Sequence, residues 1–263
     1  MLTLRPADVA IWSELLPEVL SGKMEPDGRA ERRLDPEQVG AFRFFAGSAL
    51  AARADARAPA WLGAGAAVDG PDLRASHYVA EILLRCGHLA APSGPFSDPR
   101  AFAHFSRLPA MQACRAEFVS FAVDSLPPEP GSLRVLDIGC GDGGMLAELL
   151  PALIGAGRWD EVSAVTLLDP SPAMLSSAKA RIASAWPDSH VEGRIARLED
   201  VASTLAGPHD LVVGSLSLHH MPRERWMELL AEALGPDVRP LGIRTALATP
   251  HADLFALHLG RPG

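Results

Sequence analysis

The first third of the chain repeats apolar residues at helical spacing and shows no strand-like alternation. Residues 6–22 carry an apolar stripe that stops at Gly22, and residues 35–54 open with the Asp-Pro pair typical of a helix start. A third amphipathic stretch covers residues 73–87, after a glycine-rich segment, 63–72, that we interpret as a loop. The pattern therefore predicts an all-helical N-terminal lobe.

From residue 134 onward, short apolar runs alternate with helical segments. The runs predicted as strands are residues 134–139, 162–169, 190–198, 210–218 and 242–250. The helical segments between them start near Met145 or cover residues 171–186 and 223–234. This alternation is typical of an α/β fold, and we expect a doubly wound, mostly parallel sheet with helices on both faces.

A stretch dense in Pro, Gly and Ser, LAAPSGPFSDPR, separates these two regions and is typical of a linker. One more amphipathic helix is predicted over residues 111–126. We therefore divide the chain into a helical lobe, residues 1–95, that caps the substrate or mediates dimerisation, connecting helices, 96–129, and the α/β domain, 130–263.

The first predicted strand runs into a loop with four glycines in six positions, RVLDIGCGDGGM. In a parallel sheet, ligands bind beyond the carboxyl ends of the strands, where glycines let a ligand approach the main chain. Gly139, Gly141 and Gly143 fit the spacing GxGxG, whereas Gly139, Gly141 and Gly144 fit the dinucleotide spacing GxGxxG. The glycines alone leave both kinds of ligand open.

The acidic residues around this loop favour a cationic ligand. Asp137 ends the strand and Asp142 lies in the loop, so a pyrophosphate would be repelled, whereas an amino group and a sulfonium would be attracted. Asp169 ends the second predicted strand, where it is placed to accept hydrogen bonds from two ribose hydroxyls. A nicotinamide-dependent oxidoreductase is therefore disfavoured.

Three segments in this order, VLDIGCGDGG, LLDPSPAMLSSAKARI and DLVVGSLSLHHMP, resemble the class I S-adenosylmethionine-dependent methyltransferase family. The resemblance covers about residues 115 to 250 and implies a Rossmann-like sheet of strand order 3-2-1-4-5-7-6. It also implies S-adenosyl-L-methionine as cofactor and S-adenosyl-L-homocysteine as product. We expect a small-molecule acceptor in secondary metabolism, and the alternative is a cofactor-binding protein that transfers no methyl group and is regulatory, structural or active in another reaction.

The resemblance also implies roles for individual residues. The three glycines of the GxGxG spacing would pass beneath the methionine part of the cofactor, with Asp137 steadying the loop and the amino group. Asp169 would hold the ribose diol, and Met174 would flank the adenine ring. The main chain around Gly214 and Ser215 would face the amino-acid end.

The chain departs from the family pattern at two places. Many relatives place an aspartate after the third strand to contact the adenine, but this chain has Arg197 there. Glu199, Asp200 or a main-chain carbonyl would take that role. Beyond residue 250 only a short segment follows, so we expect the C-terminal strands to be shortened and the sheet edge to be covered by a second copy of the chain or by the helical lobe.

Methyl transfer needs alignment, exclusion of water and, for a weakly acidic acceptor, a base. The candidate bases are His219 and His220, which follow the fourth predicted strand, and His104, which lies in a segment placed to cover the pocket. Histidines at such positions also occur without any catalytic role. We expect no metal site, because the nine histidines show no HExxH spacing.

Composition limits the kinds of binding partner that we expect for this chain. The formal charge of −8 argues against nucleic acid, and three cysteines without a CxxC pair argue against a disulfide framework or a zinc ribbon. Charged residues interrupt the apolar start, so we expect no signal peptide, no membrane partner and a cytoplasmic location. The aromatic residues of the helical lobe would either wall a substrate pocket or form its core: Trp12, Phe42, Phe44, Phe45, Trp61 and Tyr78.

Overall fold

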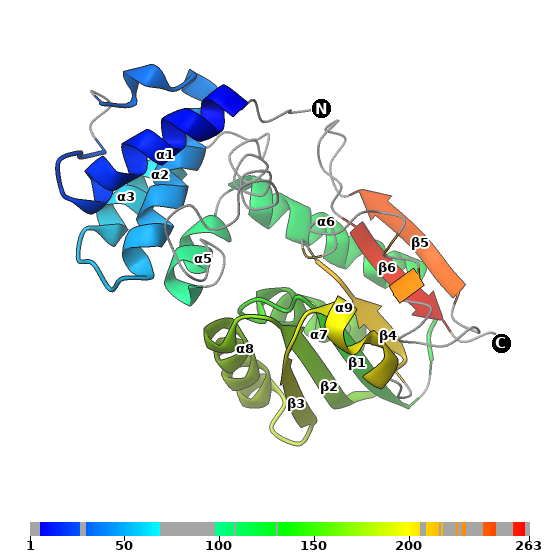
Figure 1. The fold of residues 1–263 in the computed structure, drawn as a ribbon. Helices are drawn as coiled ribbons and strands as arrows, with labels where there is room; N and C mark the ends of the chain where they lie inside the picture. The colour runs from blue at the N-terminus through cyan, green and yellow to red at the C-terminus, as the bar shows by residue number, and fades with distance from the viewer. Residues whose placement is uncertain are drawn as a thin grey trace. The chain divides into compact units, whose positions relative to one another are not determined.

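The computed structural model describes residues 6–26, 30–68, 98–107, 109–129, 131–205, 209–215, 217, 225, 228–229, 239–245 and 255–260. The chain forms two compact units, one within Met1–Ala113 and the other within Cys114–Ala248 and Ala252–Gly263. The first unit contains helices, and the second contains both described sheets (Figure 1).

The helical unit confirms the first two predicted helices and corrects the predicted loop that follows them. Its elements are α1 (Pro6–Leu20), η1 (Ala30–Arg33), α2 (Pro36–Ala51), α3 (Ala58–Val68) and α5 (Pro99–Phe105). Residues 63–68 were expected to be a loop but lie in α3. The reason is close packing, since a Cβ at Gly65 would lie 3.0 Å from the main-chain nitrogen of Phe44 on α2. The predicted helix over 73–87 lies outside the described residues.

Aromatic side chains fill the core of the helical unit. Trp12, Phe42 and Trp61 have no exposed surface, and Phe45 has almost none. The ring of Phe42 meets Trp12 edge-on at 5.4 Å between centroids and meets Trp61 edge-on at 6.3 Å. Of the two roles open to the aromatic residues of the lobe, the structure gives the core to these four and to Phe44, whereas Tyr78 lies outside the described residues.

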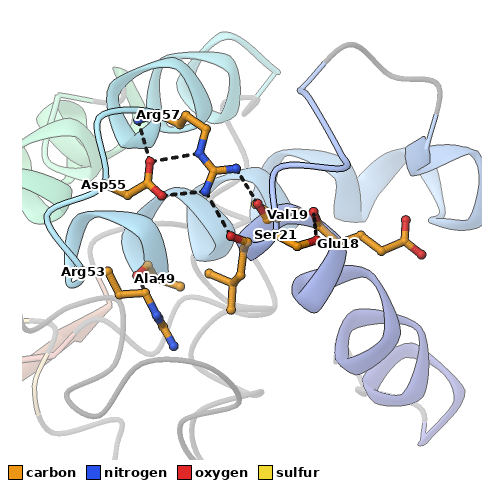
Figure 2. A network of polar contacts seen from close by, with 8 residues as sticks. Glu18, Val19, Ser21, Ala49, Arg53, Asp55 and Arg57 are labelled. Carbon is orange, nitrogen blue, oxygen red and sulfur yellow. Dashed lines mark hydrogen bonds and ion pairs between the residues drawn. The ribbon is translucent and has the colours of Figure 1, made fainter.

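The side chain of Arg57 caps the C-terminal end of α1. The guanidinium of Arg57 donates to the carbonyls of Val19 and Leu20, at 2.8 and 3.1 Å (Figure 2). Neither carbonyl has a partner within α1; that of Val19 also accepts from the amide of Gly22 at 3.0 Å, and the arginine donates to both. Asp55 holds the guanidinium by two further hydrogen bonds, of 3.0 and 2.6 Å, and this contact lowers the pKa of Asp55 to about 2.

The α/β unit contains the predicted parallel sheet. Its strands are β1 (Ser132–Ile138), β2 (Glu161–Asp169), β3 (His190–Ile195) and β4 (Leu211–Val213), in the order β3-β2-β1-β4, and every neighbouring pair is parallel. The other elements are α6 (Pro109–Ser125), α7 (Gly144–Gly155), α8 (Pro172–Ala185), α9 (Leu198–Val201) and η3 (Ala202–Thr204). Reversal of strand order beside β1 makes the carboxyl ends of β1 and β2 the expected ligand edge.

The two faces of β1 pack into separate cores. Leu133 and Val135 lie in a core with residues of α6, α7 and α8, whereas Leu136 and Ile138 lie in a core with residues of α9. The alternation follows from strand geometry, because successive side chains point to opposite faces. Asp137 therefore lies on the α7–α8 face of the sheet.

The C-terminal part differs from the expected sheet. A strand does form there, β5 (Arg239–Thr245), but it pairs antiparallel with β6 (Phe255–Gly260) and not with the parallel sheet. β6 lies against β4, so an element of the same unit covers this part of the sheet. Within the described ranges, no helix is both long and apolar enough to cross a bilayer.

Two glycines on the packed helices should respond in opposite ways to alanine. A Cβ at Gly47 would lie 2.9 Å from the main-chain nitrogen of Leu62, whereas a Cβ at Gly63 has no heavy atom within 4 Å. We expect Gly47→Ala to lower the free energy of unfolding by about 1–3 kcal/mol through overpacking. Gly63→Ala should raise it by about 0.5–1 kcal/mol through helix propensity. Urea denaturation of both variants checks this, and equal stabilisation by both would show that α2 and α3 do not approach so closely.

Candidate functional site

The carboxyl ends of β1 and β2 bring two aspartates to one edge of the sheet. Asp137 is the last residue but one of β1, and Asp169 is the last residue of β2. Both side chains are buried, with exposed fractions of 1% and 8%. The predicted placement of two carboxylates at this edge is therefore confirmed.

The glycine loop, residues 139–143, is fixed over the end of β2 by main-chain hydrogen bonds. The amides of Gly139 and Cys140 both donate to the carbonyl of Leu168, at 2.7 and 3.0 Å. The amide of Gly143 donates to the carbonyl of Cys140, at 3.0 Å, and closes the turn before α7. The loop is thus a rigid extension of the sheet.

Three glycines of this loop have left-handed backbones. Their φ angles are +67° at Gly139, +54° at Gly141 and +77° at Gly143. Side chains are strongly disfavoured in this region, so each position requires glycine on conformational grounds. Gly144 is not among the glycines with positive φ and begins α7. The left-handed set therefore follows the GxGxG spacing and not the dinucleotide spacing.

Neighbouring elements also leave no room for a side chain at two glycines of the loop, Gly139 and Gly143. A Cβ at Gly139 would lie 2.3 Å from the Cβ of Ser217, and a Cβ at Gly143 would lie 3.0 Å from the Cα of Ala178 on α8. The hydroxyl of Ser217 donates to the carbonyl of Ile138 at 2.5 Å. The sequence analysis missed Ser217, although its position two residues beyond Ser215 was a usable signal.

Asp169 joins the loops that follow β1 and β2. Its Oδ2 accepts from the amide of Gly141 at 2.9 Å, and its Oδ1 accepts from the amide of Ser171 at 2.8 Å. Burial raises the pKa of Asp169, and these two hydrogen bonds lower it. Each carboxylate oxygen can accept a further hydrogen bond, so the group can still receive a pair of hydroxyls.

Asp137 lacks such support. Its Oδ2 is buried and has no hydrogen-bond partner among the residues that the structure describes. Burial, followed by the charge of Asp169, raises the pKa of Asp137 to about 8. Burial, followed by the charges of Asp137, Asp169 and Asp142, also raises the pKa of the Cys140 thiol far above its usual range. A buried acceptor without a donor is costly, so this oxygen favours a ligand that brings a positive donor.

The role expected for Asp142 needs correction. Its Oδ2 accepts from Nη2 of Arg181 at 2.8 Å, and its Oδ1 accepts from the amide of Gly144 at 3.0 Å. The arginine neutralises this carboxylate, so Asp142 holds the loop against α8 and does not repel an anion. With Asp137 mostly protonated near neutral pH, the preference for a cation depends on the unpaired oxygen of Asp137 more than on the sum of loop charges.

The remaining predicted residues are distributed as follows. Met174 is buried in the first turn of α8, Ser215 is half-buried just beyond β4 after the buried Gly214, and Glu199 is exposed in α9. Arg197 directly precedes α9. His104 is half-buried in α5, in the other unit, and His219 and His220 lie outside the described residues.

These features fit a ligand with an amino-acid end and a nucleoside end. The glycine loop places main-chain groups at the carboxyl end of β1, Asp137 offers an acceptor without a partner among the described residues, and Asp169 offers lone pairs for hydroxyls. These hydrogen-bond acceptors therefore suit S-adenosyl-L-methionine, which carries an ammonium group at its amino-acid end and two hydroxyls on its ribose.

Comparison with known proteins agrees with this geometry. Residues 136–239 match the family described as Methyltransferase domain. The chain is 36% identical, over 115 residues, to the ubiquinone biosynthesis O-methyltransferase of Xanthomonas axonopodis pv. citri, covering 44% of this chain and 41% of that protein. It is 32% identical, over 137 residues, to highly reducing polyketide synthase 2 of Gibberella zeae, covering 48% of this chain and 5% of that protein.

Among solved structures, a SAM-dependent methyltransferase from Thiobacillus denitrificans in complex with S-adenosyl-L-homocysteine is 25% identical. The match covers 48% of this chain and 46% of that chain, with a TM-score of 0.34. The chain thus spans less than half the length of both curated relatives.

The steric constraint on the glycine loop can be separated from the backbone constraint. Gly157 has a φ of +65° and no heavy atom near its Cβ position, whereas Gly139 has a similar φ and a blocked Cβ position. We expect Gly157→Ala to lower the free energy of unfolding by about 1–2 kcal/mol, the cost of the left-handed backbone alone. Gly139→Ala should lower it further, because Ser217 must move. Denaturant titration measures both, and equal losses would contradict the close contact.

The buried carboxyl of Asp137 should make stability fall with pH. Between pH 4 and about 8 the folded protein keeps a proton on Asp137 that the unfolded chain has released, so the free energy of unfolding falls as pH rises through this window. Asp137→Asn has no titrating carboxyl at this position, so its stability should not fall in this way. Its free energy of unfolding should therefore rise relative to that of the parent as pH increases from 5 to 8. Urea denaturation across this range checks the sign, and parallel curves for the two proteins would contradict it.

Proposed function

Residues 136–239 are a class I S-adenosylmethionine-dependent methyltransferase domain, and from that premise we propose that the chain transfers a methyl group to a small organic acceptor in secondary metabolism. The observation that supports the cofactor assignment is the buried oxygen of Asp137, which has no partner among the described residues, beside a loop with three left-handed glycines. The similarity to an O-methyltransferase and to a polyketide synthase supports a small-molecule acceptor.

The chain's own residues would hold the cofactor from three sides. The bound cofactor supplies a methyl group already activated by a sulfonium. The glycine loop would admit its amino-acid end, with Asp137 accepting from the ammonium group and the main chain at Ser215 facing the same end. Asp169 would accept from the ribose hydroxyls, and Glu199 and Met174 remain our candidates for the adenine end.

The candidate bases for the methyl acceptor come from three histidines. Water must be excluded while the acceptor is aligned, and an acceptor that must lose a proton needs a base. His219 and His220 follow β4 in sequence, and His104 lies in the helical unit. We propose that the helical unit helps to choose the acceptor, since the cofactor residues all lie in the other unit.

The assignment of Asp169 predicts a specific loss. Asp169→Asn should weaken binding of S-adenosyl-L-homocysteine about 100-fold, because charge-assisted hydrogen bonds to the ribose are lost. Glu192→Gln is the matched control, since Glu192 is a partly exposed carboxylate on β3 that pairs with Arg194 and should leave binding unchanged. Calorimetric titration measures both variants, and unchanged affinity in Asp169→Asn would remove the ribose assignment.

Methyl transfer itself needs a separate test. Incorporation of tritiated methyl from labelled cofactor should be detected across a panel of phenolic, amine and carbon-acid acceptors, and NAD should not bind. Cofactor binding without transfer to any member of a broad panel would favour a binding protein over an enzyme.

A further inference from the structure

The surroundings of Asp137 contain no free cation among the described residues. On β2, the charged neighbour is Asp169, and the register places Val213 of β4 opposite Asp137. The glycine loop contributes Cys140 and Asp142, and the carboxylates of Asp137, Asp169 and Asp142 all act on the thiol of Cys140. Every ionisable group that faces Asp137 from these elements is therefore acidic.

Two arginines that lie beside the glycine loop and the start of α7 are already engaged. Arg181 of α8 pairs with Asp142 at 2.8 Å, and Arg115 of α6 pairs with Glu148 of α7 at 3.3 Å. A second buried carboxylate on the next strand makes two negative charges at this edge expensive. In the absence of ligand, one of the two carboxylates is therefore expected to be neutral. A proton on Asp137 removes that negative charge.

We propose that Asp137 selects ligands by positive charge, holding a proton in the ligand-free site and releasing it when an ammonium group binds against its carboxylate. This inference rests on the proposed function, because it needs the amino-acid end of the cofactor to reach Asp137. In the exchange the O–H bond of Asp137 breaks, the proton passes to the buffer and the ammonium group keeps its protons while donating to the carboxylate. No other bond changes.

The exchange follows from the energetics of the buried group. Burial and Asp169 raise the pKa of Asp137 to about 8, and an ammonium group at hydrogen-bond distance would lower it again. Affinity for a ligand with an amino group should therefore rise about tenfold per pH unit between pH 5 and about 8. A ligand that shares only the nucleoside should show no such dependence.

The test compares two ligands that differ in the amino-acid end. S-adenosyl-L-homocysteine carries the ammonium group, and 5′-methylthioadenosine has the same nucleoside without it. Calorimetric titration at pH 6.5, in two buffers of different ionisation enthalpy, counts the protons released on binding. We expect about one proton for S-adenosyl-L-homocysteine and none for 5′-methylthioadenosine.

Two variants locate the source of the proton. Asp137→Asn should abolish proton release by S-adenosyl-L-homocysteine. Asp142→Asn is the matched control, because the carboxylate of Asp142 lies in the same loop but is neutralised by Arg181, so release per ligand bound should persist. Release that survives Asp137→Asn would overturn the assignment.

The outcomes separate this inference from the proposed function. Binding of S-adenosyl-L-homocysteine without proton release overturns the inference and leaves the cofactor assignment intact, and so does equal release by both ligands. Failure of S-adenosyl-L-homocysteine to bind overturns both. The comparison of ligands on the unmodified protein decides the matter even if Asp137→Asn does not fold.

Discussion

The carboxylate of Asp169 connects two loops of the α/β unit, because it accepts a main-chain hydrogen bond from each of them. One bond comes from Gly141, beyond β1, and the other from Ser171, at the start of α8. The amides of Gly139 and Cys140 still donate to Leu168 of β2, but the amide of Gly141 donates to the buried carboxylate of Asp169 instead of to the main chain of a strand. The left-handed turns of the glycine loop and the position of Asp137 both depend on this connection.

The pattern of apolar residues was sufficient to predict the parallel sheet and the helices around it. Buried parallel strands have apolar runs in place of strict alternation, and the carboxyl halves of β1 and β2 are buried in this way. It failed at residues 63–68, where glycines that suggested a loop allow two helices to approach each other. It also failed at β5, since residues 239–245 look alike whether they pair with a parallel or an antiparallel neighbour. Pairing partners are long-range information that local periodicity does not contain.

The site was predictable wherever one residue type satisfies one physical need. Glycine is the residue for a left-handed turn, and this constraint is visible in sequence at Gly139 and Gly141. Charge compensation is not visible in the same way, because Arg181 lies far along the chain from Asp142 and the two meet only after α8 has packed. For the same reason, the close contact between Gly139 and Ser217 could be known only from the fold.

The burial of Cys140 and the aspartates around it affect the reactivity of its thiol. Thiolates, and not thiols, react with alkylating agents and peroxides, and both burial and neighbouring carboxylates keep this sulfur protonated. A cysteine in a glycine-rich loop at the edge of a sheet would be open to oxidation if its thiol ionised. Here burial comes first among the causes that keep the sulfur protonated, so we expect the thiol of Cys140 to react slowly with alkylating agents.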